Sequence, residues 1–463
     1  VLDEKNDVLK IQQEIIYYNN SKQPLNEIYL HNWPNSFKDK NTPLTKRLIE
    51  DYDKSLYFAK EHERGHSKIL NLSVNYKVTD FTTEKNAEDI LKINLNETLN
   101  PADSILIKAS YVVKIPYAKF TGYGKTETGY HLRYWYLTPA VFIDDWQLMS
   151  NMNIDDLFMD AANYTIQFKS SDGTFINSNI KGTKKEKSSY LFSGKNRTDI
   201  IINIDSKDNF TVYKTDKIDI VSDIYLKGLN YDLAEDIINR EIDFIESYLG
   251  SYPHKEMLVD LNSQNKNPIY GLNQLPSFLS PFSDVFNRDI TFFKAITRKY
   301  IENTLLLNKR KDYWLIDGIQ TYLMIEYVNT YYPEIKLLGK VSKIWGVRKF
   351  NLAKLNFNDK YPFVYQFSAR QFLDQALSTR VDSLSNFNRK IANKYKAGLG
   401  LQYLKGYLGD SIVKKSFKEY YKTHLLKISN SEDFNKIISS KTTKNLEWFF
   451  GDYIKTNKKI DYT

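Results

Sequence analysis

Two histidines at helical spacing are the first residues whose types and positions could do chemistry. His62 and His66 enclose Glu63 in the stretch His62-Glu-Arg-Gly-His66. On a helix this spacing places both imidazoles on one face, where they can bind zinc while Glu63 acts as general base. However, Gly65 interrupts that helix, period-two sequence resumes after His66, and no third ligand follows on a later helix. We therefore interpret the motif as a polar helix end with a glycine cap, and as a decoy for a metal site.

The other histidines and the absence of cysteine limit the remaining metal and nucleophile chemistry. The six histidines are His31, His62, His66, His131, His254 and His424, so none lies between positions 254 and 424. With no cysteine in the chain, disulfides, thiolate zinc sites and cysteine nucleophiles are excluded. No Gly-x-Ser-x-Gly motif occurs, so a serine-triad hydrolase has little support.

Composition indicates a globular chain of more than one domain. The chain has 463 residues, 42% of them hydrophobic and 14% aromatic, enough for two or three cores. Its net charge of +9 comes from 65 basic and 56 acidic residues mixed along the chain, unlike the dense basic stripe of nucleic-acid-binding proteins. The sequence contains no run of about 18 apolar residues, so it predicts no transmembrane segment. The lack of cysteine and the start at Val1 favour a trimmed, exported bacterial protein, periplasmic or associated with the outer membrane.

Alternation of apolar and polar residues dominates the first half of the chain. Such runs occur at 8–18, 25–30, 70–78, 105–113, 164–168, 200–204 and 210–213. Polar turn residues separate them, which predicts an antiparallel, saddle- or sandwich-like β domain over 1–222. Thr42-Pro43 pairs an N-cap residue with a proline at the first helical position, so we expect a helical insertion near 43–62.

The hydrophobic period changes to that of helices near position 223. Apolar residues between Leu233 and Leu249 recur at helical spacing, and Gly250 follows as a C-cap. Mostly helical patterns continue to Thr463, apart from a strand expected at 256–261. The sequence therefore predicts an α+β protein whose second domain, 223–463, is mostly helical.

Several motifs of this second domain resemble a known enzyme family. Three motifs occur in this order along the chain: Phe244-Ile-Glu-Ser-Tyr-Leu-Gly-Ser-Tyr-Pro253, Tyr270-Gly271-Leu-Asn-Gln274-Leu275 and Asp312-Tyr-Trp-Leu-Ile-Asp317-Gly-Ile-Gln-Thr-Tyr322. They are similar to the motifs of the aminopeptidase N-like (membrane alanyl aminopeptidase, gluzincin) metallopeptidases. The resemblance covers about 225–460 and implies a thermolysin-like helical domain behind the β domain.

The resemblance also implies that this chain is a degenerate bacterial member without the His-Glu-x-x-His zinc motif. Counted by the family's spacing, that motif falls on Lys294-Ala295-Ile-Thr-Arg298, which lacks both histidines and the general base. The family's third zinc ligand, a glutamate, corresponds to Asp317. We expect Lys294 or Arg298 to form an ion pair with Asp317 in place of the metal, within about 6 Å.

Three further positions carry over from the family. Gly271 and Gln274 stand where the family binds substrate, and Gln274 replaces the glutamate that holds the substrate's amino terminus. Tyr395, in Tyr395-Lys-Ala-Gly-Leu-Gly, stands close to the tyrosine that stabilises the oxyanion. Each position also has an ordinary explanation as a packed or loop residue, and only their joint spacing points to a site.

These observations favour a pseudo-peptidase over an enzyme. We expect a catalytically inactive aminopeptidase-like protein that needs no cofactor and acts as a protein-binding or scaffold module, with a protein or peptide partner and no nucleic acid. The alternative is a zinc metallo-aminopeptidase whose metal site is unorthodox or completed by a partner chain. A third possibility is a subunit of a bacterial cell-envelope complex, which predicts an exposed apolar patch.

Overall fold

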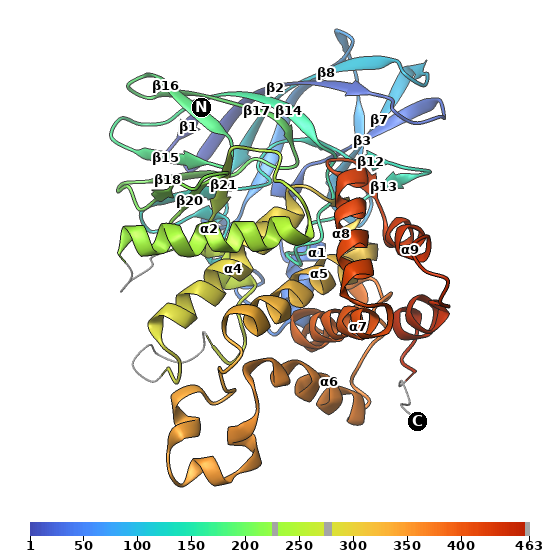
Figure 1. Ribbon diagram of the computed structural model, residues 1–463. Helices are drawn as coiled ribbons and strands as arrows, with labels where there is room; N and C mark the ends of the chain where they lie inside the picture. The colour runs from blue at the N-terminus through green and yellow to red at the C-terminus, as the bar shows by residue number, and fades with distance from the viewer. Residues whose placement is uncertain (225–229, 273–279, 459–463) are drawn as a thin grey trace. The chain divides into compact units, whose positions relative to one another are not determined.

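The chain folds as two compact units, residues 1–209 and 210–463. The computed structural model describes residues 1–224, 230–272 and 280–458 (Figure 1). The division falls between Asn209 and Phe210, earlier than the boundary expected at 222. The reason is pairing: strands β19 (Thr211–Tyr213) and β20 (Asp219–Ser222) form a small sheet with β21 (Glu256–Val259), which lies in the second unit.

The first unit is built from antiparallel sheets. One has the order β1 (Leu2–Asp3), β2 (Val8–Tyr18), β8 (Ser104–Lys114), β4 (His66–Val74), β5 (Lys77–Val78); a second has β11 (Thr138–Pro139), β3 (Leu25–His31), β7 (Ala87–Leu99), β6 (Phe81–Glu84). A third has β15 (Phe175–Ser178), β18 (Ile202–Asp205), β10 (Gly129–Leu132), β9 (Gly124–Lys125); the smaller ones are β14 (Ala162–Lys169), β17 (Ser189–Arg197), β16 (Lys181–Glu186) and the pair β12 (Val141–Phe142), β13 (Trp146–Gln147). This confirms the antiparallel β fold expected of the first half.

Alternation along the long strands explains why these sheets form. In β8, residues from Ile105 to Val113 alternate between buried and partly exposed, and the buried set joins one apolar core. The helical insertion is helix α1 (Pro43–Glu50), and the Thr42 hydroxyl accepts a hydrogen bond from the amide of Thr45, as an N-cap residue does. The chain returns to strand structure after a short 3₁₀ turn at Glu61–Glu63.

The second unit is mostly helical around its own apolar core. Its helices are α2 (Tyr231–Tyr248), α3 (Leu261–Lys266), α4 (Asp284–Glu302), α5 (Lys309–Tyr331), α6 (Lys360–Arg370), α7 (Asn393–Leu408), α8 (Asp410–His424) and α9 (Ser431–Ser439), with a short parallel pair β22 (Leu306–Leu307), β23 (Ile428–Ser429). Helix α2 ends as expected: Gly250 follows its C-cap with a φ of 112°. Within the described residues, no helix is long and apolar enough to cross a membrane.

Helices α5 and α7 approach each other closely through small residues. Gly318 of α5 faces Ala397 of α7, and Gly398 of α7 faces Thr321 of α5. A Cβ on Gly398 would lie 2.4 Å from the Cγ2 atom of Thr321, a rigid β-branched side chain. This close packing holds the two helices that carry the central charged residues described below.

We predict opposite effects for two glycine substitutions on α7. Gly398→Ala should lower the free energy of unfolding by about 1–3 kcal/mol, because the new methyl group overpacks the contact with Thr321. Gly406→Ala, where nothing lies within 4 Å of the added Cβ, should raise it by about 0.5–1 kcal/mol through helix propensity. Urea unfolding of both variants measures the difference. Equal effects at the two positions would contradict close packing at Gly398.

Candidate functional site

Helix α4 presents the residues at the expected zinc-motif positions. Its N-terminus is capped by Ser283, whose hydroxyl accepts from the amide of Phe286, and most of its surface is buried in the core. Lys294 and Arg298 lie one helical turn apart, and Ala295 packs against the core between them. Lys294, Ala295 and Arg298 therefore occupy the positions of α4 where the resemblance implies two histidines and a glutamate.

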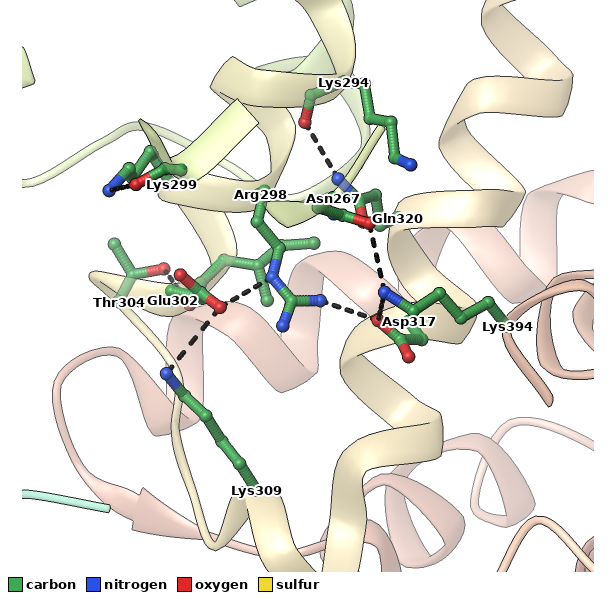
Figure 2. Close-up of polar contacts among 12 residues, drawn as sticks. Asn267, Lys294, Arg298, Lys299, Glu302, Thr304, Lys309, Asp317, Gln320 and Lys394 are labelled. Carbon is green, nitrogen blue, oxygen red and sulfur yellow. Dashed lines mark hydrogen bonds and ion pairs between the residues drawn. The ribbon is translucent and has the colours of Figure 1, made fainter. Parts of the chain in front are cut away.

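Asp317 on helix α5 forms a hydrogen-bonded ion pair with the guanidinium group of Arg298. Arg298 Nη1 donates to Asp317 Oδ1 at 2.6 Å, and only 1% of the Asp317 side chain is exposed (Figure 2). This confirms the expected ion pair between Asp317 and one of the two basic residues of α4. Lys294 turns elsewhere: its Nζ donates to the carbonyl of Pro268 at 2.8 Å.

A second cation reaches Asp317 from helix α7. Lys394 Nζ lies 3.7 Å from Asp317 Oδ1 and donates to Asn267 Oδ1 at 3.0 Å. Asn267 in turn donates to the side chain of Gln320, and Gln320 donates to the backbone carbonyl of Lys294 (Figure 2). The hydrogen bonds thus connect α4, α5 and α7 through one buried carboxylate.

Glu302 provides the second acceptor for Arg298. Arg298 Nε donates to Glu302 Oε1 at 2.6 Å, from one turn further along α4, and Lys309 Nζ lies 3.8 Å from the same oxygen. The guanidinium plane also lies over the ring of Tyr313, with 5.5 Å between Cζ and the ring centroid. Arg298 is therefore fixed by two carboxylates and an aromatic face, a geometry that its planar fork suits.

Burial and mutual repulsion govern the lysines around this centre. Burial, followed by the charges of Lys394 and Lys360, holds the pKa of Lys294 well below its usual value. Burial also opposes the charge on Lys394, but the carboxylate of Asp317 outweighs it and raises the pKa of Lys394. Burial lowers the pKa of Lys360, at the start of α6, to about 7. Burial and the neighbouring charges thus disfavour a further positive charge at this centre.

The side chains at this centre do not fit a zinc ion. Zinc in proteins takes neutral imidazole, thiolate or carboxylate ligands, and catalytic sites use three of them. Here the only carboxylate at the expected position is already bound by a guanidinium and an ammonium group. Lysine and arginine have no lone pair to donate while protonated. Among the residues that the structure describes, no group of three His, Asp or Glu side chains is arranged to hold a metal ion.

The histidine motif of the first unit is not arranged as a helical zinc site either. His62 belongs to the 3₁₀ turn and packs edge-on against Tyr117, whereas His66 begins strand β4. The carboxylate of Glu63 pairs with Lys119, so it is neutralised.

The expected glycine cap at position 65 is wrong. Gly65 has no positive φ, and it is required because an added Cβ would lie 2.6 Å from the ring of Pro116. The motif therefore ends against a neighbouring proline rather than in a capping turn.

The remaining expected site residues are spread around α7 and a turn. Tyr395 is buried in a small apolar cluster, edge-on to Tyr361 with 4.7 Å between ring centroids, and burial raises its pKa. Gly271 lies in a turn with a φ of 81°. Gln274 lies outside the described residues. Tyr395 itself is not the residue of α7 that contacts Asp317; the preceding residue, Lys394, makes that contact.

Sequence reasoning missed Lys394, Asn267, Gln320 and Glu302 as members of this centre. Glu302 was detectable, since it lies four residues after Arg298 on the same helix and Arg–Glu pairs at this spacing interact. Gln320 was also within reach of local spacing, since it lies three residues after Asp317 on α5. Lys394 and Asn267 come from other elements, and no local spacing relates them to Asp317.

We predict that Arg298→Met lowers the free energy of unfolding by about 3–5 kcal/mol, because it leaves the buried carboxylate of Asp317 with Lys394 alone. The double variant Arg298→Met, Asp317→Leu should recover part of this loss, since the buried carboxylate is removed while Lys394 still donates to Asn267 and Glu302 keeps Lys309 nearby. Urea unfolding measures both. Lys458→Ala, which removes an exposed ion pair with Asp452, is the control and should cost about 0–1 kcal/mol. A double variant no more stable than Arg298→Met would contradict this account.

We also predict a pH dependence from Lys360. In the unfolded chain its amine stays protonated up to about pH 10.5, whereas in the folded protein it loses its proton near pH 7. Between these values the unfolded state binds more protons, so the contribution of Lys360 to stability rises with pH by about 1.4 kcal/mol per unit. Lys360→Met should therefore be more stable than the parent at pH 7, by a margin that shrinks towards pH 10. A margin that is constant with pH would contradict a neutral buried Lys360.

Comparison with known proteins gives matches in structure alone. No family model matches the chain, and no curated protein sequence does. An M1 zinc metallopeptidase from Deinococcus radiodurans has a similar structure, with a TM-score of 0.62 at 10% sequence identity over 98% of this chain and 91% of that one. A mutant of the M1 zinc metallopeptidase from the same organism, bound to a Tyr-Ser-Ala substrate, gives a TM-score of 0.60 at 11% identity with the same coverage.

A mutant described as a two-domain M1 zinc metallopeptidase, bound to L-tryptophan, gives a TM-score of 0.58 at 11% identity. This match also covers 98% of the present chain and 91% of the mutant's chain. At such low identity the likeness concerns the fold. The chain has the two-domain fold of M1 zinc metallopeptidases, of the aminopeptidase N type.

Proposed function

We propose that this protein is a non-catalytic member of the M1 metallopeptidase fold that binds a protein or peptide partner rather than cleaving it. The observation that supports this most directly is the occupation of Asp317 by two protein cations, Arg298 at 2.6 Å and Lys394 at 3.7 Å. Both cations contact Oδ1, whereas Oδ2 accepts no hydrogen bond from the residues that the structure describes, so it is the two positive charges beside the carboxylate that oppose the binding of a metal ion.

The residues at the centre also lack a replacement for the lost catalytic groups. Ala295 stands where a general base is expected, and a methyl group takes no proton. Arginine is protonated at every physiological pH and accepts no proton, so Arg298 does not activate a water molecule. Lys294 is neutral when its pKa is lowered far enough, but its Nζ already donates to the Pro268 carbonyl.

The charge of the centre argues against an aminopeptidase substrate as the ligand. The amino terminus of a peptide is a cation near neutral pH, and at Asp317 it would approach the positive charges of Arg298 and Lys394. Like charges within a few ångström repel strongly where water is excluded. A partner that presents carboxylates or backbone carbonyls fits this centre better than a free amino terminus does.

The proposal also includes a cellular location for the protein. The absence of cysteine is compatible with an exported protein, and we infer a periplasmic or outer-membrane-associated location in a cell-envelope complex. The binding role needs no cofactor.

We predict that untagged protein dialysed against zinc retains less than about a tenth of an equivalent by mass spectrometry, because the centre offers no adequate ligand set. It should also leave the tripeptide Tyr-Ser-Ala intact, since no group at the centre supplies a nucleophile of sufficient strength. Amino-acid release measured by chromatography tests the second expectation.

Two variants sharpen this measurement. Replacing Lys294, Ala295 and Arg298 by His, Glu and His, together with Asp317→Glu, should restore near-stoichiometric zinc if α4 and α5 keep the geometry of a metal centre. His62→Ala with His66→Ala is the matched control and should change nothing. The alternative, a metallo-aminopeptidase, would be established by a different outcome. The parent would then bind stoichiometric zinc and cleave Tyr-Ser-Ala, and the His62→Ala, His66→Ala variant would lose the zinc.

A further inference from the structure

A lobe of the second unit, residues 338–354, projects between helices α5 and α6. It contains three short 3₁₀ turns, Gly339–Lys343, Val347–Lys349 and Asn351–Lys354. Figure 1 shows this segment in orange, extending away from the helices of its unit. We call it the basic lobe, for the residues described below.

The base of the basic lobe is held firmly. The amide of Leu337 donates to the carbonyl of Leu355 at 2.9 Å, next to an antiparallel bridge between Lys336 and Asn356. The amide of Lys340 donates to the Pro281 carbonyl at 2.7 Å. The lobe is thus a closed loop with a defined base rather than a loose connection.

Large apolar side chains cover the outside of the basic lobe. Trp345 is 67% exposed, Phe350 is 68% exposed and Ile344 is 55% exposed, and Val341 and Leu352 are also exposed. Exposing so many large apolar groups in one segment is costly in water, and such clusters mark interaction surfaces. The envelope-complex hypothesis expected an exposed apolar patch, and the lobe provides a cluster of this kind.

The charged residues of the same lobe are all basic. Lys340, Lys343, Arg348, Lys349 and Lys354 are all exposed, and no acidic residue occurs between positions 338 and 354. None of the five forms an ion pair with a residue that the structure describes, while Lys349 Nζ lies 4.2 Å from the ring centroid of Trp345. The lobe therefore combines five cations with five apolar side chains on a stretch of 17 residues, counted from 338 to 354.

Several backbone groups of the lobe form hydrogen bonds within it. The amides of Arg348, Phe350 and Ala353 donate to carbonyls three or four residues earlier, and Ser342 donates its hydroxyl to the Gly339 carbonyl. A segment that enters the boundary of a bilayer must not bring unpaired amides into it. The hydrogen bonds of the 3₁₀ turns lower the cost of entry for the amides that form them.

Helix α6, which follows the lobe, also has apolar residues on an exposed face. Phe363 and Phe367 lie one helical turn apart and are 59% and 56% exposed, and Phe372 and Leu373 are exposed just beyond the helix. Helical residues four apart share a face, so these side chains form a second apolar surface in the same part of the unit.

We propose that the basic lobe, supported by the exposed face of α6, docks on the surface of an anionic phospholipid bilayer. Trp345, Phe350 and Ile344 would enter the boundary between headgroups and acyl chains, while lysine and arginine reach the phosphates. A second copy of the chain is a poor occupant, because lobe packed against lobe would oppose five cations with five. This inference does not depend on the proposed binding role of the α4–α5 centre.

Vesicle flotation with the full chain tests the proposal. The protein should bind vesicles containing roughly one third phosphatidylglycerol, should not bind pure phosphatidylcholine, and should detach at about 0.5 M salt. Trp345→Ala with Phe350→Ala, and separately Lys343→Glu with Arg348→Glu and Lys349→Glu, should each weaken binding by roughly tenfold or more.

Matched controls lie in the first unit. Tyr52→Ala with Tyr76→Ala removes two aromatic side chains that are 92% and 77% exposed, and Lys184→Glu with Lys185→Glu and Lys187→Glu makes the same change in net charge. Both controls should bind as the parent does. The proposal is overturned if the parent ignores anionic vesicles, or if the control and lobe variants lose binding equally. Self-association in light scattering that the lobe variants abolish, without vesicle binding, would assign the lobe to a second copy.

Discussion

The buried pair of Arg298 and Asp317 is the interaction on which the helical unit depends. A carboxylate that is 1% exposed would be destabilising alone, by several kcal/mol, and its environment must supply a cation. Arg298 comes from α4, and Lys394 adds a second cation from α7, so three helices meet at one side chain of α5. The close contact of Gly398 with Thr321 brings α7 near enough for this.

The charges at this centre explain how the buried carboxylate of Asp317 is stabilised. A zinc ion would bring two positive charges to the carboxylate of Asp317. Arg298, which is shared with Glu302, and Lys394 supply positive charge there from side chains. What they do not reproduce is Lewis acidity: an ion pair polarises no bound water and lowers no water pKa in the way that zinc does. Stabilising the buried carboxylate therefore requires positive charge but not a Lewis acid.

Much of this arrangement was predictable from the sequence, because it rests on local patterns. Period-two runs predicted the β strands of the first unit, and the helical period with Gly250 predicted α2 and its end. The pairing of Asp317 with either Lys294 or Arg298 followed from the spacing of the family's motifs, and the structure shows that Arg298 is the partner. Lys394 was not predictable in this way, because its contact with Asp317 depends on how α7 packs on α5. The unit boundary was misplaced for a related reason: β20 pairs in parallel with β21, across the intervening helix α2, and sequence alternation alone does not reveal strand partners.

The basic lobe and the charged centre follow different physical rules within one unit. The centre is buried, and each of its charges needs a protein partner. The lobe is exposed, and its five cations and its aromatic side chains have no partner among the described residues apart from the Lys349–Trp345 contact and the weak hydrogen bond of Lys354 to Asn351. Selection for stability alone would remove an exposed Trp and Phe cluster, since each exposed apolar side chain favours association. Its presence on a firmly held loop is therefore better explained by a surface that the folded protein meets, and the absence of acidic residues specifies the sign of that surface.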